Sequence, residues 1–356
     1  MVGRKREPAG AQPDLVSATK DGSMVGGTRN QGSPTISDVA ERAGVSRAVV
    51  SRALSPEPRP VSADKRERVL RAAAELGFKP NLLAQSLVSK SVNLVAVVVN
   101  HIHDFSDLDL FDLLIDRIQS TGKQVILVRV GSVARVEEFL RQGIAYHVDA
   151  ALVLSDFADA ATVRAMFRTD HVIMLNGRHD GLSPAVMPDE NKGIAEAVAD
   201  AAAKGVRRAA LLTGRRTSAV ERARIRSYRS NLKRQGIALI REVQGDYSYR
   251  SGHEAAAALV GDDAPDAVFC TSDAMAMGVL DARRADFPND RPSRFRLYGF
   301  DNLSLMDCDA YPIASIGYDK RTYVDEIISI LAELEKFGLR HRPVLVPTTF
   351  VPRATA

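Results

Sequence analysis

The 356-residue sequence predicts a small all-helical head followed by an α/β core of two doubly wound parallel sheets. Between Thr35 and Gly77, apolar residues recur at helical spacing in three short segments. From residue 93 onward, short apolar runs alternate with amphipathic helical stretches instead. Such alternation over about 250 residues is typical of parallel sheets covered on both faces, and two sheets fit this length better than one.

The charge of the chain is unevenly distributed. Residues 1–90 hold 15 Lys and Arg against 9 Asp and Glu, a net charge of about +6 within a total of +4. A basic amino-terminal part on a near-neutral body indicates a module that binds polyanions. The apolar run Leu94–Val99 is too short to cross a bilayer, and we recognise no signal peptide, so we expect a cytoplasmic protein with no membrane partner.

The chain divides into four parts on composition and pattern. Residues 1–33 are rich in Gly, Ser, Pro and charge, which predicts a disordered leader, and Met24 is an alternative start. We expect the helical head at 34–79, a hinge helix and linker at 80–92, and a two-lobed core at 93–356. With two cysteines in the whole chain, we expect no metal site, no disulfide framework and no cofactor.

The head carries local signals for three helices. Thr35 and Asp38 have the spacing of a capping box, and Gly44 can end that first helix in the left-handed conformation. Ser46 is placed to cap a second helix two residues later, and Ser62 to cap a third. The short connection between the first two predicts a helix-turn-helix, whose second helix enters the major groove of DNA.

The second helix is predicted to present a polar face to DNA. At 100° per residue one face carries Arg47, Ala48, Ser51 and Arg52, and the opposite face carries Val49, Val50, Ala53 and Leu54. We predict that Arg52 and Arg47 read guanine through O6 and N7, and that Ala48 contacts a thymine methyl. Ser51 is expected to contact a phosphate or sugar.

Several strings at fixed spacing resemble the lactose-repressor (LacI) family of bacterial transcriptional regulators. In the head these are Thr35 to Ser46, Val50-Ser51-Arg52, Leu76 to Asn81, and Ala84 to Leu87. In the core they include Arg224 before Tyr228, Gly245 to Ser248, Pro265 to Cys270, and Gly299 to Asn302. The resemblance implies a dimeric, sometimes tetrameric, regulator with a core like the type I periplasmic binding proteins. An effector bound to that core would change the affinity for an operator.

The resemblance also assigns roles beyond the second helix. Residues 81–87 resemble the family's hinge helix, which folds in the minor groove when two copies meet. Leu87 would then be the wedge that unstacks a central base step, and Asn81, Ala84 and Gln85 would line the groove. The helix starts at Thr35, Ser46 and Ser62 can each hold a phosphate oxygen, although capping alone also explains these residues.

The core is predicted to bind a small polar ligand at the carboxyl ends of its strands. Asp301 at a strand end and Asp189 in the lobe crossover can accept hydrogen bonds from hydroxyls. Arg224 can donate as a fork to two hydroxyls or a carboxylate, and Tyr247 occupies the position of a stacking aromatic in the family. The expected lining is completed by Asn100, Ser272 and Tyr318.

Together these patterns predict a ligand-responsive regulator, and we expect a repressor. It would bind double-stranded pseudopalindromic operator DNA as a homodimer or tetramer, under a small effector such as a sugar or sugar derivative. An activator, or a regulator that needs a corepressor, would have the same architecture. Asp189, Asp301 and His253 could be imagined as a hydrolase set, but we find no nucleophile, phosphate-loop or dinucleotide motif, so we expect no enzyme. The missing signal peptide and the head argue against a periplasmic receptor.

Overall fold

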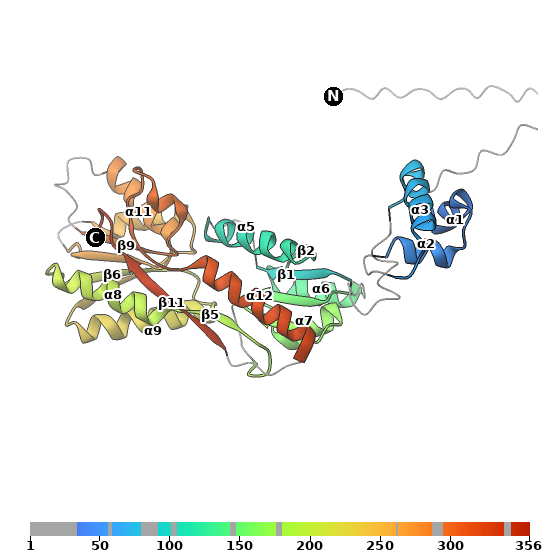
Figure 1. Ribbon diagram of the computed structural model, residues 1–356. Coiled ribbons are helices and arrows are strands. Elements are labelled where there is room, and N and C mark those ends of the chain that lie inside the picture. The colour runs from blue at the N-terminus through green and yellow to red at the C-terminus, as the bar shows by residue number, and fades with distance from the viewer. Residues whose placement is uncertain are drawn as a thin grey trace, which may run out of the picture. The chain divides into compact units, whose positions relative to one another are not determined.

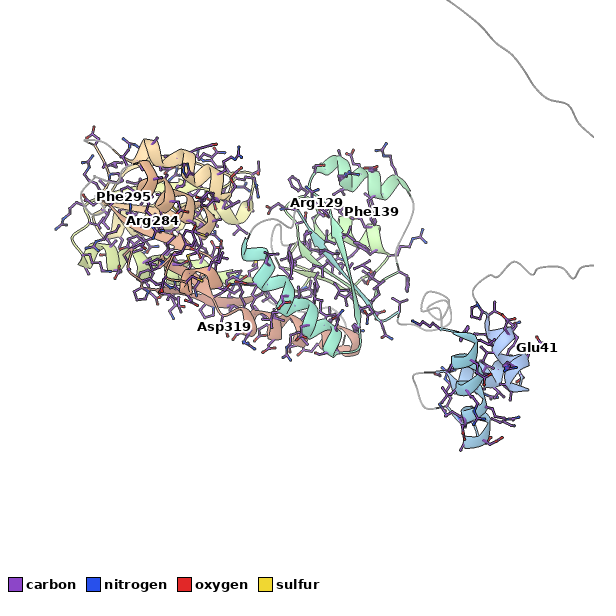
Figure 2. All side chains as sticks on the ribbon, turned by 90° about the horizontal axis from the view of Figure 1, so that it is seen from above. Glu41, Arg129, Phe139, Arg284, Phe295 and Asp319 are labelled. Atoms are coloured by element: carbon purple, nitrogen blue, oxygen red, sulfur yellow. The ribbon has the colours of Figure 1, made fainter. Side chains whose placement is uncertain are left out.

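The computed structural model describes residues 34–55, 59–79, 92–100, 105–142, 147–175, 180–260, 263–286, 295–337 and 343–356. The chain forms two compact units that meet in sequence at Asn81 and Leu82 (Figure 1). The first unit is helical and the second is α/β, as predicted. The side chains are dense in both lobes of the second unit, with Arg129 and Phe139 in one lobe and Arg284 and Phe295 in the other (Figure 2).

Three helices enclose the core of the first unit: α1 (Ile36–Ala43), α2 (Arg47–Ala53) and α3 (Ala63–Leu76). Val39, Val50 and Val69, one from each helix, are fully buried against one another. The predicted capping box is confirmed, because Thr35 Oγ1 accepts from Asp38 N at 3.4 Å and an Asp38 carboxylate oxygen accepts from Thr35 N at 2.7 Å. Gly44 ends α1 at φ 63°, as expected of a left-handed cap.

The first lobe of the core is a parallel sheet in the order β2-β1-β3-β4. Its strands are β1 (Leu94–Val99), β2 (Gln124–Arg129), β3 (Ala150–Leu154) and β4 (Val172–Met174). Its own helices are α5 (Phe105–Ser120), α6 (Val133–Gln142) and α7 (Ala160–Phe167). A bridge from Met174 to Ala185 continues the sheet toward the second lobe.

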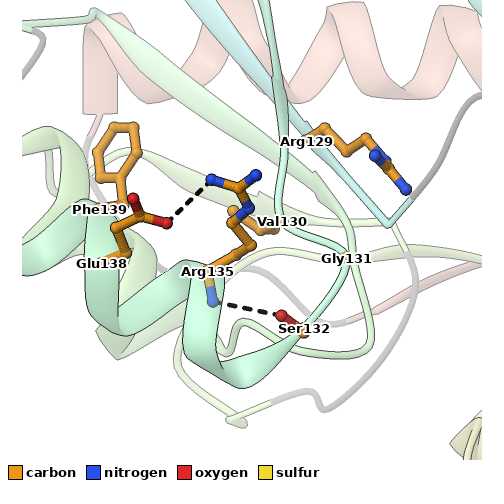
Figure 3. A pocket seen from close by; sticks show the side chains of 7 residues that line it. All are labelled: Arg129, Val130, Gly131, Ser132, Arg135, Glu138 and Phe139. Carbon is orange, nitrogen blue, oxygen red and sulfur yellow. Dashed lines mark hydrogen bonds and ion pairs between the residues drawn. The ribbon is translucent and has the colours of Figure 1, made fainter. Parts of the chain in front are cut away.

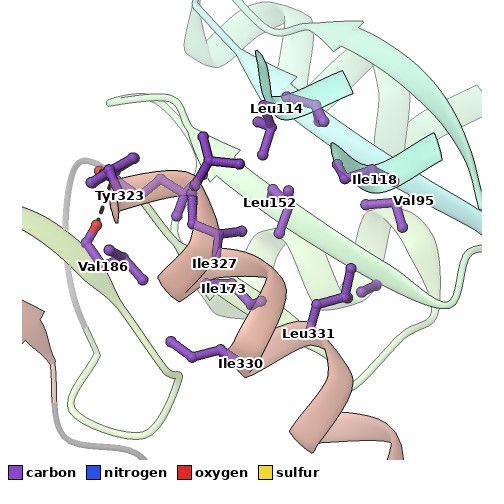
Figure 4. Close-up of a cluster of buried hydrophobic side chains, with 14 of the residues drawn as sticks. Val95, Leu114, Ile118, Leu152, Ile173, Val186, Tyr323, Ile327, Ile330 and Leu331 are labelled. Carbon is purple, nitrogen blue, oxygen red and sulfur yellow. Dashed lines mark hydrogen bonds between the residues drawn. The ribbon is translucent and has the colours of Figure 1, made fainter. Parts of the chain in front are cut away.

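Alternate residues of β1 are buried on opposite faces of this sheet. Val95 and Val97 face α5 and the long helix α12 (Lys320–Phe337), where Leu114, Leu152 and Ile327 complete the cluster of Figure 4. The residues between them, Ala96 and Val98, face α6 and α7. Burial on both faces explains why these strands read as unbroken apolar runs in the sequence.

The second lobe is a seven-stranded sheet in the order β5-β11-β10-β9-β8-β6-β7. Its strands are β5 (Val186–Asp189), β6 (Arg208–Thr213), β7 (Ala238–Gln244), β8 (Ala267–Cys270), β9 (Arg296–Phe300), β10 (Ala314–Tyr318) and β11 (Val344–Val351). Its helices are α8 (Glu190–Ala203), α9 (Ala219–Arg234), α10 (Tyr249–Ala255), α11 (Asp273–Asp286) and the 3-10 turns η1 (Ala256–Leu259) and η2 (Ser304–Asp307). The clusters around Tyr228 and around Met275 bury its two faces.

One strand departs from the predicted parallel arrangement. β11 pairs antiparallel with β10 and parallel with β5. The reason is the path of the chain: β10 leads into α12, which packs on the first lobe, and the chain returns to the second lobe through β11. The two doubly wound lobes are confirmed, but the second sheet is mixed rather than purely parallel.

Candidate DNA-binding and effector-binding sites

Helix α2 presents the polar face that its sequence predicts. Its exposed residues are Arg47, Ala48, Ser51 and Arg52, whereas Val50 and Ala53 are buried and Val49 is half-buried. Arg66 of α3 fixes the end of the helix, donating to Ala53 O at 2.9 Å and to Arg59 O at 3.1 Å. The helix is therefore held by its apolar side with two guanidinium groups outward, a geometry suited to a DNA groove.

The three helix starts of the head differ in how their hydroxyls are used. The Thr35 hydroxyl is engaged in the capping box, where it donates to Asp38 at 2.8 Å and accepts from Asp38 N. Ser46 and Ser62 have the extended backbone of N-cap residues, but neither side chain makes a capping hydrogen bond to its helix. Their hydroxyls, unlike that of Thr35, are not used by the helix they precede.

The predicted hinge residues Asn81, Ala84, Gln85 and Leu87 lie outside the described residues. Just beyond them, Val92 N donates to Asp149 Oδ1 at 2.7 Å, and Lys123 Nζ lies 3.0 Å from the other oxygen of that carboxylate. Both ion-pair partners are about nine-tenths buried, with 10% and 8% of their side chains exposed. The chain that enters the core is thus anchored firmly at residue 92.

Arg224 lies at the centre of the predicted effector residues, but its donor fork is occupied. Its Nε donates to Glu190 Oε2 at 3.1 Å, its Nη2 donates to Glu190 Oε1, and its Nη1 donates to Thr271 O at 2.6 Å. The guanidinium carbon lies 3.6 Å from the centroid of the Phe300 ring. Burial alone would lower the pKa of Arg224, but Glu190 raises that pKa well above its usual value.

Tyr247 is positioned by a buried carboxylate. Its hydroxyl donates to Glu221 Oε2 at 2.9 Å, while Glu221 Oε1 accepts from Gly214 N at 2.7 Å and from Thr271 Oγ1 at 2.8 Å. The Tyr247 ring packs closely against Gly214, where an added Cβ atom would lie 2.0 Å from a ring carbon. Burial, and then the charge of Glu221, raise the pKa of Tyr247.

Asp301 is a half-buried carboxylate at the end of β9, held at φ 107°. Its backbone oxygen accepts from Lys320 Nζ at 3.4 Å, and its backbone N–H donates to Ile316 O at 2.7 Å. Burial raises the pKa of the Asp301 carboxyl well above its usual value, against the opposing charge of Arg224. A non-glycine residue in this backbone region is strained, which is common at ligand sites.

The neighbouring residues Ser272 and Asp273 stabilise the start of α11. Ser272 Oγ donates to Tyr247 O at 3.4 Å and accepts from Met275 N at 3.3 Å. Asp273 is fully buried, and its carboxylate accepts from Ser315 Oγ at 2.6 Å and Leu303 N at 2.9 Å. Burial raises the pKa of Asp273 to about 7.

Two sets of hydrogen bonds connect the lobes near these residues. Asn100, which follows β1, accepts from Ser155 Oγ at 2.7 Å and from Asp156 N at 3.0 Å, and Ser218 at the start of α9 donates to Asp156 Oδ1 at 3.5 Å. On α5, the Asp109 carboxylate accepts from Ser304 N and Oγ, each at 3.1 Å. Asn100 is therefore linked across the lobes through Asp156.

The structure brings most of the predicted effector residues together and separates others. Arg224, Tyr247, Ser272 and Asp301 form one cluster at the ends of β8 and β9. The other three predicted residues have different environments. Asn100 accepts from Ser155 Oγ and Asp156 N, Asp189 caps α8 by accepting from Asn191 N at 3.2 Å, and the centroid of the Tyr318 ring lies 4.9 Å from that of Tyr323. The carboxylates of Glu190 and Glu221, which complete the cluster, were not predicted.

A cavity of about 440 Å³, separate from the predicted effector residues, lies where β2 ends and α6 begins (Figure 3). Arg135 crosses it to reach Glu138 at 2.9 Å, and its backbone N–H donates to Ser132 Oγ at 3.3 Å. The residues that line it are Arg129, Val130, Gly131, Ser132, Arg135, Glu138 and Phe139. None of the predicted effector residues lines this cavity, although Gly131 packs against the backbone oxygen of Asn100.

Comparisons with known proteins cover both units. The model of bacterial regulatory proteins of the lacI family matches residues 35–81, and a periplasmic binding protein-like domain matches residues 198–356. Catabolite control protein A of Priestia megaterium is 29% identical over 285 residues, 76% of this chain and 83% of that protein. The lactose operon repressor of Escherichia coli K12 is 26% identical over 326 residues, 90% of each chain. The lac repressor dimer solved with operator and the anti-inducer ONPF matches with a TM-score of 0.77 at 26% identity, over 90% of this chain and 98% of that one.

The helix-turn-helix and the two-lobed core define a DNA-binding transcriptional regulator with a core like the periplasmic binding proteins. Its first unit matches the lacI family of bacterial regulatory proteins, and the whole chain is similar in sequence and fold to the lac repressor. Its matched relatives are transcriptional regulators rather than enzymes. Among the residues that the structure describes, none of the helices combines the length and apolar character needed to span a membrane.

Proposed function

We propose that this regulator is a cytoplasmic repressor that binds a pseudopalindromic operator as a dimer and responds to a small polar effector. The observation that carries the DNA-binding half is the exposed face of α2, with Arg47 and Arg52 outward and Val50 buried behind them. The related lac repressor was solved as a dimer bound to its operator, which supports the same assembly here.

In this proposal Arg52 and Arg47 read guanine in the major groove, and Ala48 contacts a thymine methyl. Ser51, Ser46 and Ser62 contact the phosphate backbone and fix the register of the head. The phosphate contact is supported for Ser46 and Ser62, because their hydroxyls make no capping hydrogen bond to the helices that they precede. Thr35, whose hydroxyl is engaged in its capping box, contributes through the backbone N–H groups that follow it.

The hinge residues complete the DNA contact in this proposal. Asn81, Ala84 and Gln85 approach the minor groove, and Leu87 inserts between base pairs at the centre of the operator. Because two hinges must meet to fold there, an effector that changes their spacing changes operator affinity. DNA and effector then change each other's affinity for the protein by the same factor.

The effector is proposed to bind between the lobes, at the cluster of Arg224, Tyr247, Ser272 and Asp301. The observation that best supports an effector at this cluster is the state of Asp301. Its backbone is strained, and its half-buried carboxylate makes no hydrogen bond with the described residues. Such a group is stabilised by a ligand that donates hydroxyls to it. Asn100, Asp189 and Tyr318 lie at the neighbouring strand and crossover ends and would complete the site, and a sugar or sugar derivative matches these donors and acceptors.

The DNA-binding half is tested by fluorescence anisotropy with a duplex selected from a random-sequence library by repeated binding to this protein. Arg52→Ala is expected to reduce discrimination between the selected duplex and random DNA by roughly 5- to 150-fold, which corresponds to about 1–3 kcal/mol. Arg71→Ala, which removes an exposed α3 guanidinium paired with Glu67, is the matched control and should leave the discrimination unchanged. Equal discrimination by the wild type and Arg52→Ala would contradict the proposal.

A further inference from the structure

Arg224 of α9 forms an ion pair with Glu190 of α8 inside the cluster. The two side chains are only 10% and 11% exposed, and their contact uses both the Nε and Nη2 donors of the guanidinium. A third donor, on Nη1, is used by Thr271 O at 2.6 Å. A guanidinium has five N–H donors, so two remain for a ligand, one on each terminal nitrogen.

A ligand that uses those two donors would bind close to the Glu190 carboxylate. An uncharged hydroxyl oxygen can accept from the remaining N–H groups without repulsion, because Glu190 already balances the positive charge. A carboxylate, phosphate or sulfate in the same place would bring a second negative charge against Glu190 in a partly buried site. Like charges in such a setting weaken binding on the order of 100-fold.

The rest of the cluster adds to this repulsion. Glu221 is fully buried, and its carboxylate faces Gly214, Thr271 and Tyr247, which are all uncharged donors. The charge of Arg224 also acts on Asp301, where it opposes the rise in pKa that burial causes. Two further described cations lie near the cluster: Lys320, whose Nζ is 3.4 Å from Asp301 O and 3.8 Å from an Asp109 oxygen, and Arg215, whose guanidinium carbon is 5.1 Å from the centroid of the Tyr247 ring. Of these cations, Arg224 is the one that Glu190 pairs with directly.

We infer that Glu190 is a specificity-determining residue, an internal anion that fills the fork of Arg224 and excludes effectors bearing a carboxylate, phosphate or sulfate. The inference rests on the proposal that the effector binds at this cluster, and it narrows that effector to an uncharged or amine-bearing polyhydroxylated molecule. The bidentate contact of Arg224 with Glu190 is then a structural ion pair. The ligand can accept only from the two remaining N–H groups of Arg224, one on each terminal nitrogen.

The test compares the full-length wild type with three variants, two at Glu190 and one at an exposed glutamate. Thermal unfolding is followed against sodium sulfate and sodium glucuronate, with sodium chloride keeping the ionic strength constant. The wild type should show no saturable stabilisation by either anion. Glu190→Gln keeps the shape but frees the guanidinium charge, so it should gain saturable stabilisation at anion concentrations at least 10-fold below any that affect the wild type. Glu190→Asp, which keeps the charge, and Glu254→Gln, which removes an exposed carboxylate of α10, should behave as the wild type.

Two results would overturn the inference: saturable anion binding by the wild type, or no gain of anion binding in Glu190→Gln. A second measurement needs no variant and therefore does not depend on folding of Glu190→Gln. The wild type is screened with matched pairs, glucose against glucuronate and ribose against ribose 5-phosphate, and a stronger response to the charged member of either pair also refutes it. If Glu190→Gln gains anion binding while uncharged sugars leave the wild type unaffected, Glu190 retains its role and the proposed sugar effector fails.

Discussion

Asp273 is a buried carboxyl whose replacement should make the core more stable at neutral and alkaline pH. Its two oxygens accept from Ser315 Oγ at 2.6 Å and from Leu303 N at 2.9 Å. Asparagine has the same shape, and its oxygen can accept from Leu303 N while its amide donates to the Ser315 hydroxyl. Asp273→Asn therefore keeps both hydrogen bonds and removes the buried charge.

The magnitude follows from the pKa of this group. Burial raises the pKa of Asp273 from 3.8 to about 7 in the folded protein. Below pH 3.8 the carboxyl is protonated in both states, so it carries no penalty. Between pH 3.8 and 7 the unfolded chain releases the proton and the folded chain retains it, so the free energy of unfolding falls by about 1.36 kcal/mol per pH unit. Above pH 7 the full loss is roughly 4 kcal/mol, which the uncharged asparagine does not suffer.

The assay is urea unfolding of the full chain at pH 5, 6, 7 and 8, with the core transition compared between variant and wild type. The advantage of Asp273→Asn should grow from pH 5 to pH 8 by up to about 3 kcal/mol, since the slope ends near pH 7. Asp263→Asn removes a well-exposed carboxylate and should show no such trend. A stability difference that is the same at pH 5 and pH 8 would refute the reasoning, because the buried charge would then not be the source of the effect.

Three further substitutions test the packing around the cluster by the same unfolding assay. Tyr228→Phe should stabilise the core by about 1 kcal/mol, because the Tyr228 hydroxyl is buried and has no partner among the described residues; a clear loss of stability would reveal a partner. Glu221→Ala should cost at least about 3 kcal/mol, since the N–H of Gly214 and the hydroxyls of Thr271 and Tyr247 lose their acceptor, whereas Glu221→Gln should cost less than about 1. Gly214→Ala should destabilise by about 1–3 kcal/mol, because its Cβ would lie 2.0 Å from the Tyr247 ring, and an unchanged midpoint would show that the ring can move.

The head and the central strands were predictable because their signals are local. The capping box joins residues three apart, Thr35 and Asp38, and needs no tertiary contact. The apolar runs that became β1, β3, β6, β8 and β9 are continuous because helices cover both faces of their sheets. The edge strand β7 was not predicted, since its half-exposed residues include Arg241 and Glu242. β11 was not predicted either, because it contains Pro347 and exposed Leu345 and pairs antiparallel at the crossover.

The structure gathers four of the predicted effector residues, but the donor fork of Arg224, which was expected to be open to a ligand, is mostly occupied by Glu190 and Thr271 O. Arg224 and Tyr247 could be chosen by position, whereas their carboxylate partners are separated from them by 34 and 26 residues and are brought close only by the fold. Nothing in the periodicity of α8 distinguishes Glu190 from an exposed glutamate at a helix start. The partners of buried charges are thus the part of the site that depends on tertiary structure.

The cost of burying a charge still restricts the possible effectors, even before the anion that pairs with Arg224 is identified. An arginine on the buried side of a helix requires a compensating anion, because an unpaired buried charge costs several kcal/mol. If the chain itself supplies that anion, the arginine cannot also be the anchor of an acidic ligand; if it does not, the ligand must supply it. Glu190 supplies it here, at the first position of α8, where a carboxylate also interacts favourably with the helix dipole. If the effector binds at this cluster as proposed, its charge therefore depends on the residue that balances Arg224 rather than on Arg224 itself.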